Sequence, residues 1–277
     1  MDWNWLQSLL FGFISGFAEF LPISSDAHQY LLGYFMGSGN ELLGFRLFCH
    51  ISVLAALLFS SRFQLKRLSR ERRIAAAPLK RRKRQPDRNA LLDLRLLKTA
   101  VIPIILAFAA SWYTQCVFEN LWALALVLIV NGILLYVPQF FPSGNKESQA
   151  MSALDALLIG FGGALAVVPG ISRVGILTSV GQLRGADGRY CVDIALLLCI
   201  PALLILIGFD IYGLYLAQSV LAVSLFFSYL FAAAAAFAGA YFGILLLRFL
   251  AVKTGFSGFA YYCWGVALLT FALYLTI

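Results

Sequence analysis

Apolar residues fill most of the chain in long continuous runs that are separated by short polar stretches. A run of about 18 residues or more is long enough for a helix to cross a hydrocarbon core of about 30 Å. Because the runs do not alternate in polarity, they favour membrane-spanning helices over a β-barrel. Six runs predict complete transmembrane helices: 43–60, 97–115, 121–139, 191–209, 219–247 and 258–277.

Two further apolar stretches, 3–36 and 153–183, are interrupted by polar residues that a lipid-facing helix does not tolerate. The first is broken between Glu19 and His28, and the second is broken around Pro169. Polar or unwound backbone at membrane depth is tolerated where it lines a cavity. We therefore expect each stretch to form a re-entrant helical hairpin, which enters and leaves the membrane on the same side.

The distribution of charge along the chain predicts its orientation in the membrane. Only 12% of the 277 residues are charged, against roughly 25% in a typical soluble domain, which excludes a water-soluble globule. Residues 62–98 hold 14 of the 21 Lys and Arg residues and only three acidic ones, so this one segment makes the chain basic. The positive-inside rule places it in the cytoplasm as a loop. Contact with anionic lipid headgroups is a compatible second role, and nucleic-acid binding is a poor third.

Counting spans from this cytoplasmic loop puts both termini outside and the other basic clusters between spans inside. The first hairpin then opens from outside and the second from inside. The chain is predicted to be a single membrane domain, residues 1–277, made of two units of opposite orientation at about 1–140 and 153–277. Residues 12–24 and 160–172 are weakly alike, which supports an inverted repeat whose broken helices meet near the bilayer midplane and form the site.

The first break carries several reactive groups. If a helix restarts after the proline, Ser24 or Ser25 can cap it, and its free N–H groups attract an anion. Ser25 and His28 are three residues apart and share a helical face, as a nucleophile and base pair would, with Glu19 available to orient the imidazole or to hold a cation. The alternative is that the serines only cap the helix and His28 satisfies them.

The second break places an arginine, Arg173, at membrane depth, where it needs an anionic partner. A cationic clamp for phosphate is its natural role, and the neighbouring glycines would let a phosphate approach the backbone. The alternative is that Arg173 pairs with Glu19 only to hold the two hairpins together. His50 is expected to be packed inside the bundle, and Asp193 and Asp210 are assigned no role.

The two breaks read EFLPISSDAH at residues 19–28 and PGISRVG at residues 169–175. Together, in an apolar chain of this length, they resemble the two motifs of the undecaprenyl-diphosphate phosphatase family of the bacitracin-resistance type. The resemblance covers most of the chain and implies an all-α polytopic membrane protein with six transmembrane helices and two re-entrant hairpins in an inverted-topology repeat. It also implies a bacterial plasma-membrane enzyme that converts undecaprenyl diphosphate to the monophosphate, which recycles the lipid carrier of peptidoglycan synthesis.

By this resemblance Glu19, Ser25, His28 and Arg173 are the catalytic residues. Glu19 is also the expected ligand of a divalent cation, Mg or Ca. Five neighbouring residues are candidates for substrate binding: Ser24, Asp26, Gly170, Ser172 and Gly175. The expected partner is a polyprenyl phosphate or diphosphate lipid and not a nucleic acid, and the oligomeric state is open, with a homodimer among the alternatives.

The chain also departs from the family pattern. Ser15 stands where the first motif has a Glu, and residues 26–27 read Asp-Ala where it has Thr-Gly. Val174 and Leu177 replace a Ser and a Thr of the second motif, and His50 replaces a usual Gln. The retained residues favour the phosphatase. The departures favour a second interpretation, a non-catalytic or transport homologue that binds polyprenyl phosphate and moves it across the membrane by alternating access.

Overall fold

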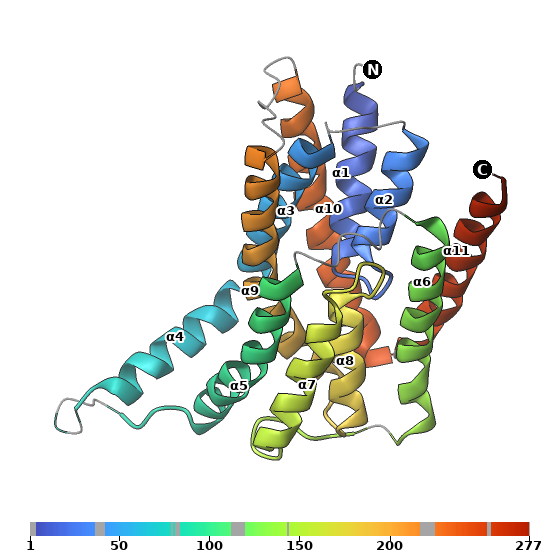
Figure 1. Ribbon diagram of the computed structural model, residues 1–277. Coiled ribbons are helices and arrows are strands. Elements are labelled where there is room, and N and C mark those ends of the chain that lie inside the picture. Colours follow the sequence, from blue (N-terminus) through green and yellow to red (C-terminus); the bar gives the residue numbers. More distant parts are fainter. Residues whose placement is uncertain are drawn as a thin grey trace.

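The fold is a bundle of helices, seen in a computed structural model (Figure 1). It describes residues 4–36, 42–78, 80, 84–111, 120–142, 144–216, 225–253 and 256–276. Within these residues the chain forms no named β-strand, and an isolated β-bridge joins Lys146 to Ala186.

The helices follow one another along the whole described chain. In the first half they are α1 (Trp5–Glu19), α2 (Ser25–Phe35), α3 (Leu42–Ser60), α4 (Arg62–Ala76), α5 (Arg88–Ala110), α6 (Leu121–Tyr136) and the 3-10 helix η3 (Val137–Phe140). In the second half they are α7 (Ala153–Leu165), α8 (Arg173–Leu183), α9 (Gly188–Leu216), α10 (Phe226–Lys253) and α11 (Ser257–Thr276).

Five helical segments among the described residues are long and apolar enough to cross a membrane: α3, α6 with η3, α9, α10 and α11. Each corresponds to one of the spans that the sequence predicts. The remaining predicted span, 97–115, overlaps α5, which starts nine residues earlier inside the basic segment. Its predicted end lies outside the described residues. The structure therefore gives an all-helical protein with several membrane-spanning helices.

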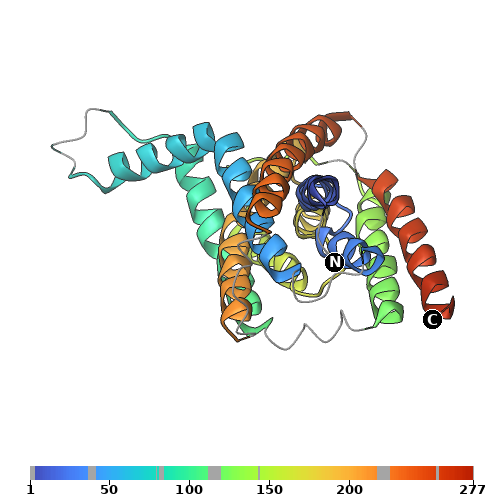
Figure 2. The same cartoon turned by 90° about the horizontal axis from the view of Figure 1, so that it is seen from above.

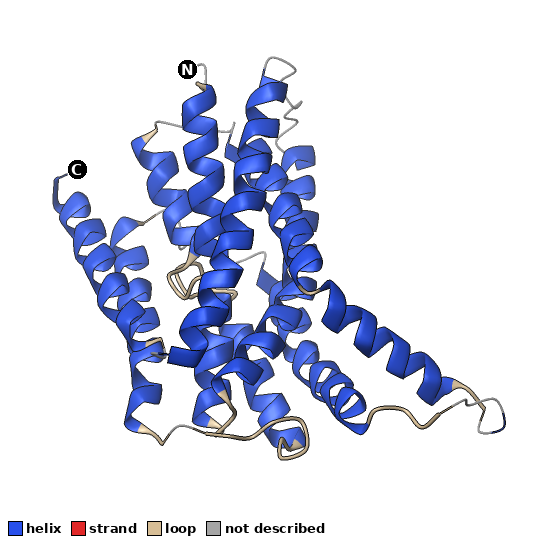
Figure 3. Ribbon diagram, turned by 180° about the vertical axis from the view of Figure 1, so that it is seen from behind, coloured by secondary structure: helices blue, strands red, loops and turns tan. Residues whose placement is uncertain are grey.

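Both interrupted stretches are broken where the sequence predicts. Residues 20–24 separate α1 from α2, and residues 166–172 separate α7 from α8. The two helices of each pair pack against each other, and the connections of the two pairs lie at about the same height, deep inside the molecule (Figures 1 and 3). Each pair is thus a helical hairpin, and the tips of the two hairpins face each other.

Close packing between α1 and α10 fixes the height of the first tip. Gly12 and Gly16 face the backbone of α10, and a Cβ on Gly16 would lie 2.1 Å from the carbonyl oxygen of Ala236. Small residues four apart let two membrane helices approach to backbone contact. Viewed from above, α1 lies near the middle of the bundle with α10 beside it (Figure 2). This contact holds Glu19, one turn after Gly16, at the centre of the protein.

The basic segment, which the sequence predicts as a loop, contains a helix. Leu65 and Leu68 of α4 lie three residues apart and share one face, and Leu68 packs with Ala90 of α5 and Leu197 of α9. This apolar contact explains why a strongly basic stretch folds into a regular element. The strongly basic composition does not indicate this helix, because only a few apolar positions mark its buried face.

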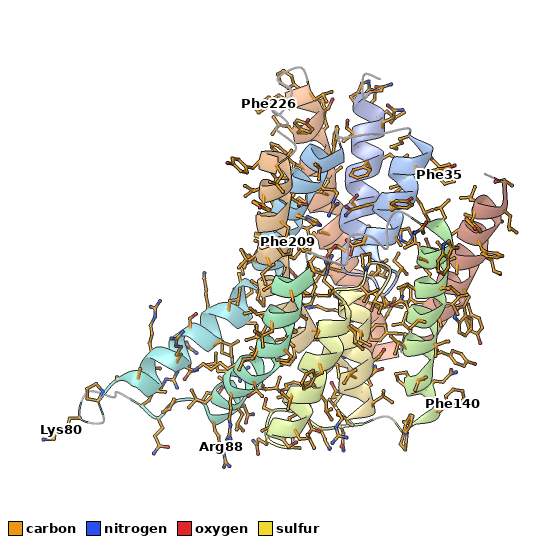
Figure 4. All side chains as sticks on the ribbon, viewed as in Figure 1. Phe35, Lys80, Arg88, Phe140, Phe209 and Phe226 are labelled. Carbon is orange, nitrogen blue, oxygen red and sulfur yellow. The ribbon has the colours of Figure 1, made fainter. Side chains whose placement is uncertain are left out.

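Helix α4 leaves the bundle as an arm, with Lys80 beyond its far end and Arg88 back at the start of α5 (Figures 2 and 4). Both ends of the chain lie on the opposite side of the hairpin tips from this arm (Figure 1). That arrangement agrees with the predicted separation of the basic segment from the two termini. Which side faces the cytoplasm stays a prediction.

Candidate functional site

Each hairpin restarts its second helix with a serine cap. The Ser24 Oγ accepts a hydrogen bond from the Ala27 N–H at 3.4 Å, and the Ser172 Oγ accepts one from the Gly175 N–H at 3.1 Å. Ser24 adopts a φ of 67°, a left-handed conformation that costs about 1–3 kcal/mol for a residue with a side chain. Buried surroundings hold it there, since Ser24 is only 2% exposed. The predicted cap of the first hairpin is therefore Ser24.

The two tips are bonded to each other, so the N-termini of α2 and α8 converge. The Ser172 hydroxyl donates to the carbonyl oxygen of Leu21 in the first tip at 3.1 Å. A helix N-terminus carries a partial positive charge and unpaired N–H groups, and it favours a bound anion. Two such ends at one place make the meeting point of the hairpins a natural anion site.

Asn131 of α6 joins the two tips, and the sequence analysis missed it. Its side-chain oxygen accepts the Ser172 N–H at 2.8 Å, and its Nδ2 lies 3.5 Å from the carbonyl oxygen of Pro22. The residue is fully buried. A signal existed, because an amide in the middle of an apolar span is costly without a partner and marks a functional or bridging position.

Arg173, Glu19 and Ser25 form a buried cluster between the tips. The Arg173 guanidinium donates two hydrogen bonds to Glu19 Oε1, at 3.0 Å from Nε and 2.6 Å from Nη2. The Ser25 hydroxyl donates to Glu19 Oε2 at 2.5 Å, and Arg173 Nη2 also lies 3.3 Å from the Ser25 oxygen. All three residues are at most 5% exposed. The structure brings three of the four predicted catalytic residues into direct contact, and their catalytic roles stay a prediction.

The charge balance of the cluster is negative. Arg173 faces two carboxylates, since its Nη1 also lies 3.9 Å from Asp26 Oδ2. In the low dielectric of the protein interior such pairs interact far more strongly than in water. A diphosphate that enters here must displace one carboxylate from the guanidinium or bring additional positive charge.

His28 has partners other than Ser25. Its Nδ1 lies 2.7 Å from the carbonyl oxygen of Ser24, so that nitrogen donates, and its Nε2 accepts from the hydroxyl of Tyr262 at 2.7 Å. The two rings are stacked with centroids 5.7 Å apart. The spacing on α2 predicts that Ser25 and His28 pair, but the Ser25 hydroxyl turns back to the carboxylate of Glu19. Tyr262 of α11 was missed, because nothing in an aromatic-rich span distinguishes it.

An apolar cavity of about 930 Å³ adjoins this cluster. Its walls come from α1, α2, α10 and α11, with Phe17, Leu31 and Phe259 among the lining residues. Its polar side chains include those of His28 and Tyr262. Ala18, Leu21 and Ile23 also line it, so the cavity reaches the first hairpin tip. Its lining is predominantly apolar, which suits an apolar ligand.

The two glycines proposed to admit a phosphate are packed on their Cα side. Gly170 has a φ of 104° and faces Val127, so it allows the sharp turn of the second tip. A Cβ on Gly175 would lie 2.9 Å from Leu135 and 3.1 Å from Pro22. Gly175 thus permits the close approach of the two tips, and Gly170 packs against α6. Their contact with substrate stays a prediction.

The other polar residues of the bundle are paired or buried. His50 is 1% exposed, which confirms that it is packed, and its Nδ1 lies 2.6 Å from Asp210, which also pairs with Arg46 at 3.5 Å. Asp193 pairs with Arg248 at 3.3 Å. The Ser15 hydroxyl, at the position of the missing family carboxylate, is buried and has no hydrogen-bond partner among the described residues.

The residues present fit a divalent cation only in part. Oxygen donors are what Mg and Ca prefer, and Glu19 and Asp26 supply two carboxylates on opposite sides of Arg173. No group of three or more His, Cys, Asp or Glu side chains suited to a metal occurs among the described residues. Mg commonly takes one or two carboxylates and completes its shell with water and substrate phosphate oxygens. The donor set fits a cation that is shared with a phosphate ligand.

The chain is similar in sequence to one known family of proteins. The family described as bacitracin resistance protein BacA matches residues 8–269. An undecaprenyl-diphosphatase from Nocardioides sp. is 32% identical over 205 residues, which cover 73% of this chain and 72% of that protein. Undecaprenyl-diphosphatases from Methanobrevibacter smithii and Carboxydothermus hydrogenoformans are 27% and 26% identical, and each alignment covers at least 96% of both chains.

Proposed function

The chain belongs to the BacA family of bacitracin resistance proteins, and on this premise we propose that it hydrolyses a polyprenyl diphosphate, such as undecaprenyl diphosphate, to the monophosphate and inorganic phosphate. One observation carries the proposal: Arg173, Glu19 and Ser25 are in direct contact at the meeting point of two broken hairpins. The names of its relatives support the same activity.

Substrate binding uses the apolar cavity and the hairpin tips together. The prenyl chain lies in the cavity of about 930 Å³, and the diphosphate lies at the N-termini of α2 and α8. Arg173 exchanges Glu19 for phosphate oxygens, because a planar guanidinium can bind two of them side by side. The exchange releases the Glu19 carboxylate next to the Ser25 hydroxyl.

The first chemical step uses the hydrogen bond between Ser25 and Glu19. As the Ser25 oxygen forms a bond to the terminal phosphorus, its proton passes to Glu19 Oε2, which already accepts it at 2.5 Å. The bond between the terminal phosphorus and the bridging oxygen breaks, and polyprenyl monophosphate leaves. Arg173 and the two helix N-termini stabilise the charge on the phosphoryl oxygens.

The second step returns the enzyme to its starting state. His28 Nε2 exchanges the Tyr262 hydroxyl for a water molecule and accepts a proton from it as the water attacks phosphorus. The bond from phosphorus to the Ser25 oxygen breaks, and Glu19 returns its proton to that oxygen. His28 passes the proton that it took from water to the departing inorganic phosphate or to solvent, so each group regains its starting protonation state. A direct attack by the His28-activated water on the diphosphate would use the same residues in one step.

A divalent cation, Mg or Ca, would be held by Glu19 together with substrate oxygens, and it would neutralise phosphate charge. The excess of carboxylate over guanidinium in the cluster supports this role. Ser24 and Ser172 then contribute to substrate binding as the N-caps of α2 and α8. Gly170 and Gly175 contribute through their backbone at the second tip.

The membrane arrangement that goes with this function has six spans and two re-entrant hairpins. The six spans are the five long apolar segments described above and α5. The units 1–140 and 153–277 form an inverted repeat within one membrane domain. The basic arm faces the cytoplasm and both termini face outside, in a bacterial plasma membrane. The two matched helix breaks and the separation of the arm from the termini support this arrangement. A homodimer stays a prediction.

Phosphate release by the purified protein tests the function. We expect undecaprenyl diphosphate to be hydrolysed at a much lower KM than a short-chain diphosphate, because only the long chain fills the apolar cavity. Released phosphate is measured in detergent with both substrates at equal concentration. No release from either, together with binding of polyprenyl phosphate that depends on Arg173, would support the lipid carrier instead.

A further inference from the structure

A second cavity, of about 720 Å³, lies away from the hairpin tips, where α3 ends and α4 begins. It is bounded by the end of α3, the first turns of α4 and α9, and the C-terminal part of α10. Three arginines from three helices line it: Arg67, Arg189 and Arg248. One acid, Asp193, lines it as well, so the charged lining is positive.

These guanidiniums retain donors for a ligand. A guanidinium has five N–H donors, and Arg67 uses Nε and Nη2 on Asp87, at 3.2 Å and 2.8 Å. Arg248 uses one donor on Ser60 and one on Asp193. The side chain of Arg189 is exposed and makes no hydrogen bond or ion pair within the described part of the chain. The ion pairs thus hold two arginines in place while the third is open.

Aromatic rings stand beside the charges. Phe63 and Phe249 line the same cavity and are 70% and 53% exposed. The walls α3, α9 and α10 are helices apolar enough to span a membrane, and the cavity is at their ends. At the end of a membrane helix, an exposed phenylalanine ring can contact acyl chains while an arginine beside it reaches the headgroup level.

We propose that this cavity binds the phosphate of an anionic phospholipid headgroup. Basic pockets between membrane helices recognise such headgroups, and arginine forms paired hydrogen bonds to phosphate oxygens. The volume suits one headgroup, and the two phenylalanines would contact the start of its acyl chains. The site is separate from Arg173 and Glu19, so the inference does not depend on the proposed hydrolysis.

The experiment compares lipid binding by matched arginine variants. Detergent-purified protein is titrated with phosphatidylglycerol or phosphatidylcholine, and the bound fraction is measured by native mass spectrometry. We expect Arg189→Gln to weaken phosphatidylglycerol binding about fivefold, which is the effect of one arginine near an anionic lipid. The control Arg72→Gln removes the same charge from an exposed position on α4 outside the cavity and should change binding less than about twofold.

A third variant gives the opposite sign. Asp193→Asn removes the acid from the lining and should strengthen phosphatidylglycerol binding by about fivefold, which a merely structural ion pair would not do. Equal weakening by Arg189→Gln and Arg72→Gln would overturn the proposal, as would equal affinity for phosphatidylcholine. Competition by millimolar inorganic phosphate without any preference between the lipids would assign the cavity to free phosphate and also overturn it.

Discussion

At the scale of single residues, the hydrogen bonds to Glu19 hold the guanidinium of Arg173 in place. Glu19 receives two of its hydrogen bonds, and the same carboxylate receives the hydroxyl of Ser25. Removing one partner of a buried charge pair leaves the other charge uncompensated. The pair therefore holds the two hairpins together. It also places the Arg173 guanidinium, the Glu19 base and the Ser25 nucleophile next to one another. The structural and the catalytic interpretations of Arg173 do not exclude each other.

Arg173→Lys should retain the charge but lose most of the activity. An ammonium acts as a point charge and cannot bind two phosphate oxygens in the fixed geometry of a guanidinium. We expect kcat to fall by about a hundredfold or more, as when a positioned donor to a reacting oxyanion is removed, while substrate affinity falls less. Steady-state phosphate release measures both. A variant with the turnover of the wild type would exclude phosphate recognition by this side chain.

Tyr262→Phe should change turnover by less than about fivefold, because water replaces this hydroxyl on Nε2 before the chemical step and the variant loses only a neutral hydrogen bond of the resting state. The ring that stacks on His28 remains, so the imidazole keeps its place and loses only the donor to Nε2. His28→Ala should cost more, about 10² to 10⁴ in kcat, because the proton acceptor itself is lost. Parallel rate measurements compare the two. Equal losses would mean that Tyr262 does more than orient the imidazole.

At the scale of elements, the contact of α1 with α10 sets the position of Glu19. Gly16→Ala places a methyl group where a Cβ would be 2.1 Å from a backbone oxygen, so the helices must separate. We expect a loss of stability of about 1–3 kcal/mol together with reduced activity. Gly265→Ala is the matched control, since a Cβ there meets nothing within 4 Å. Thermal unfolding of both variants in detergent tests this, and equal melting temperatures would refute the close contact.

The buried carboxylate of Glu71 on α4 closes the arm, because it accepts hydrogen bonds from Arg84 and from the Asp87 N–H in the segment that leads back to α5. A hydrogen bond from Arg84, together with the Asp87 N–H at 3.0 Å and Arg70 at 3.0 Å, lowers the pKa of Glu71 from its ordinary 4.5 to about 2. A lowered carboxylate pKa contributes stability that is fully present above about pH 4.5 and is lost as the pH falls toward 2. The closure should therefore be insensitive to pH near neutrality.

Hydrogen exchange at the Asp87 amide, which donates to Glu71, measures this closure. After correction for the intrinsic exchange rate, its protection should be constant from pH 8 to about 5 and should fall as the pH approaches 2. Glu71→Gln should lower the protection at neutral pH and remove most of the pH dependence. Protection that changes between pH 8 and 5 would assign the closure to another group.

At the scale of the whole molecule, the apolar pattern predicts most of the fold. Continuous runs locate the long helices, and buried polar residues locate both hairpin breaks, because membrane depth makes each exception costly. The apolar pattern could not predict the boundaries of α5 or the existence of α4. Charged residues extend α5 at its start, and a single buried leucine, Leu68, packs α4 against its neighbours.

The same comparison holds for the candidate site. The two motifs predict the meeting of Glu19, Ser25 and Arg173, since each motif places its polar residues at one break. The partners of His28 and Ser25 could not be predicted, because they depend on rotamers and on Tyr262, a residue 234 positions away in the sequence. Spacing gives the residues that share a face, and tertiary packing decides which of them bond.

The most direct test of the account is the fate of oxygen-18 during turnover in labelled water. Undecaprenyl diphosphate is hydrolysed by the wild type with Mg, and both products are analysed by mass spectrometry. Attack on the terminal phosphorus predicts oxygen-18 in inorganic phosphate and none in undecaprenyl monophosphate, with labelling reduced to background in Ser25→Ala. Label in the lipid product, or equal labelling with Ser25→Ala, would contradict hydrolysis by the cluster of Arg173, Glu19 and Ser25.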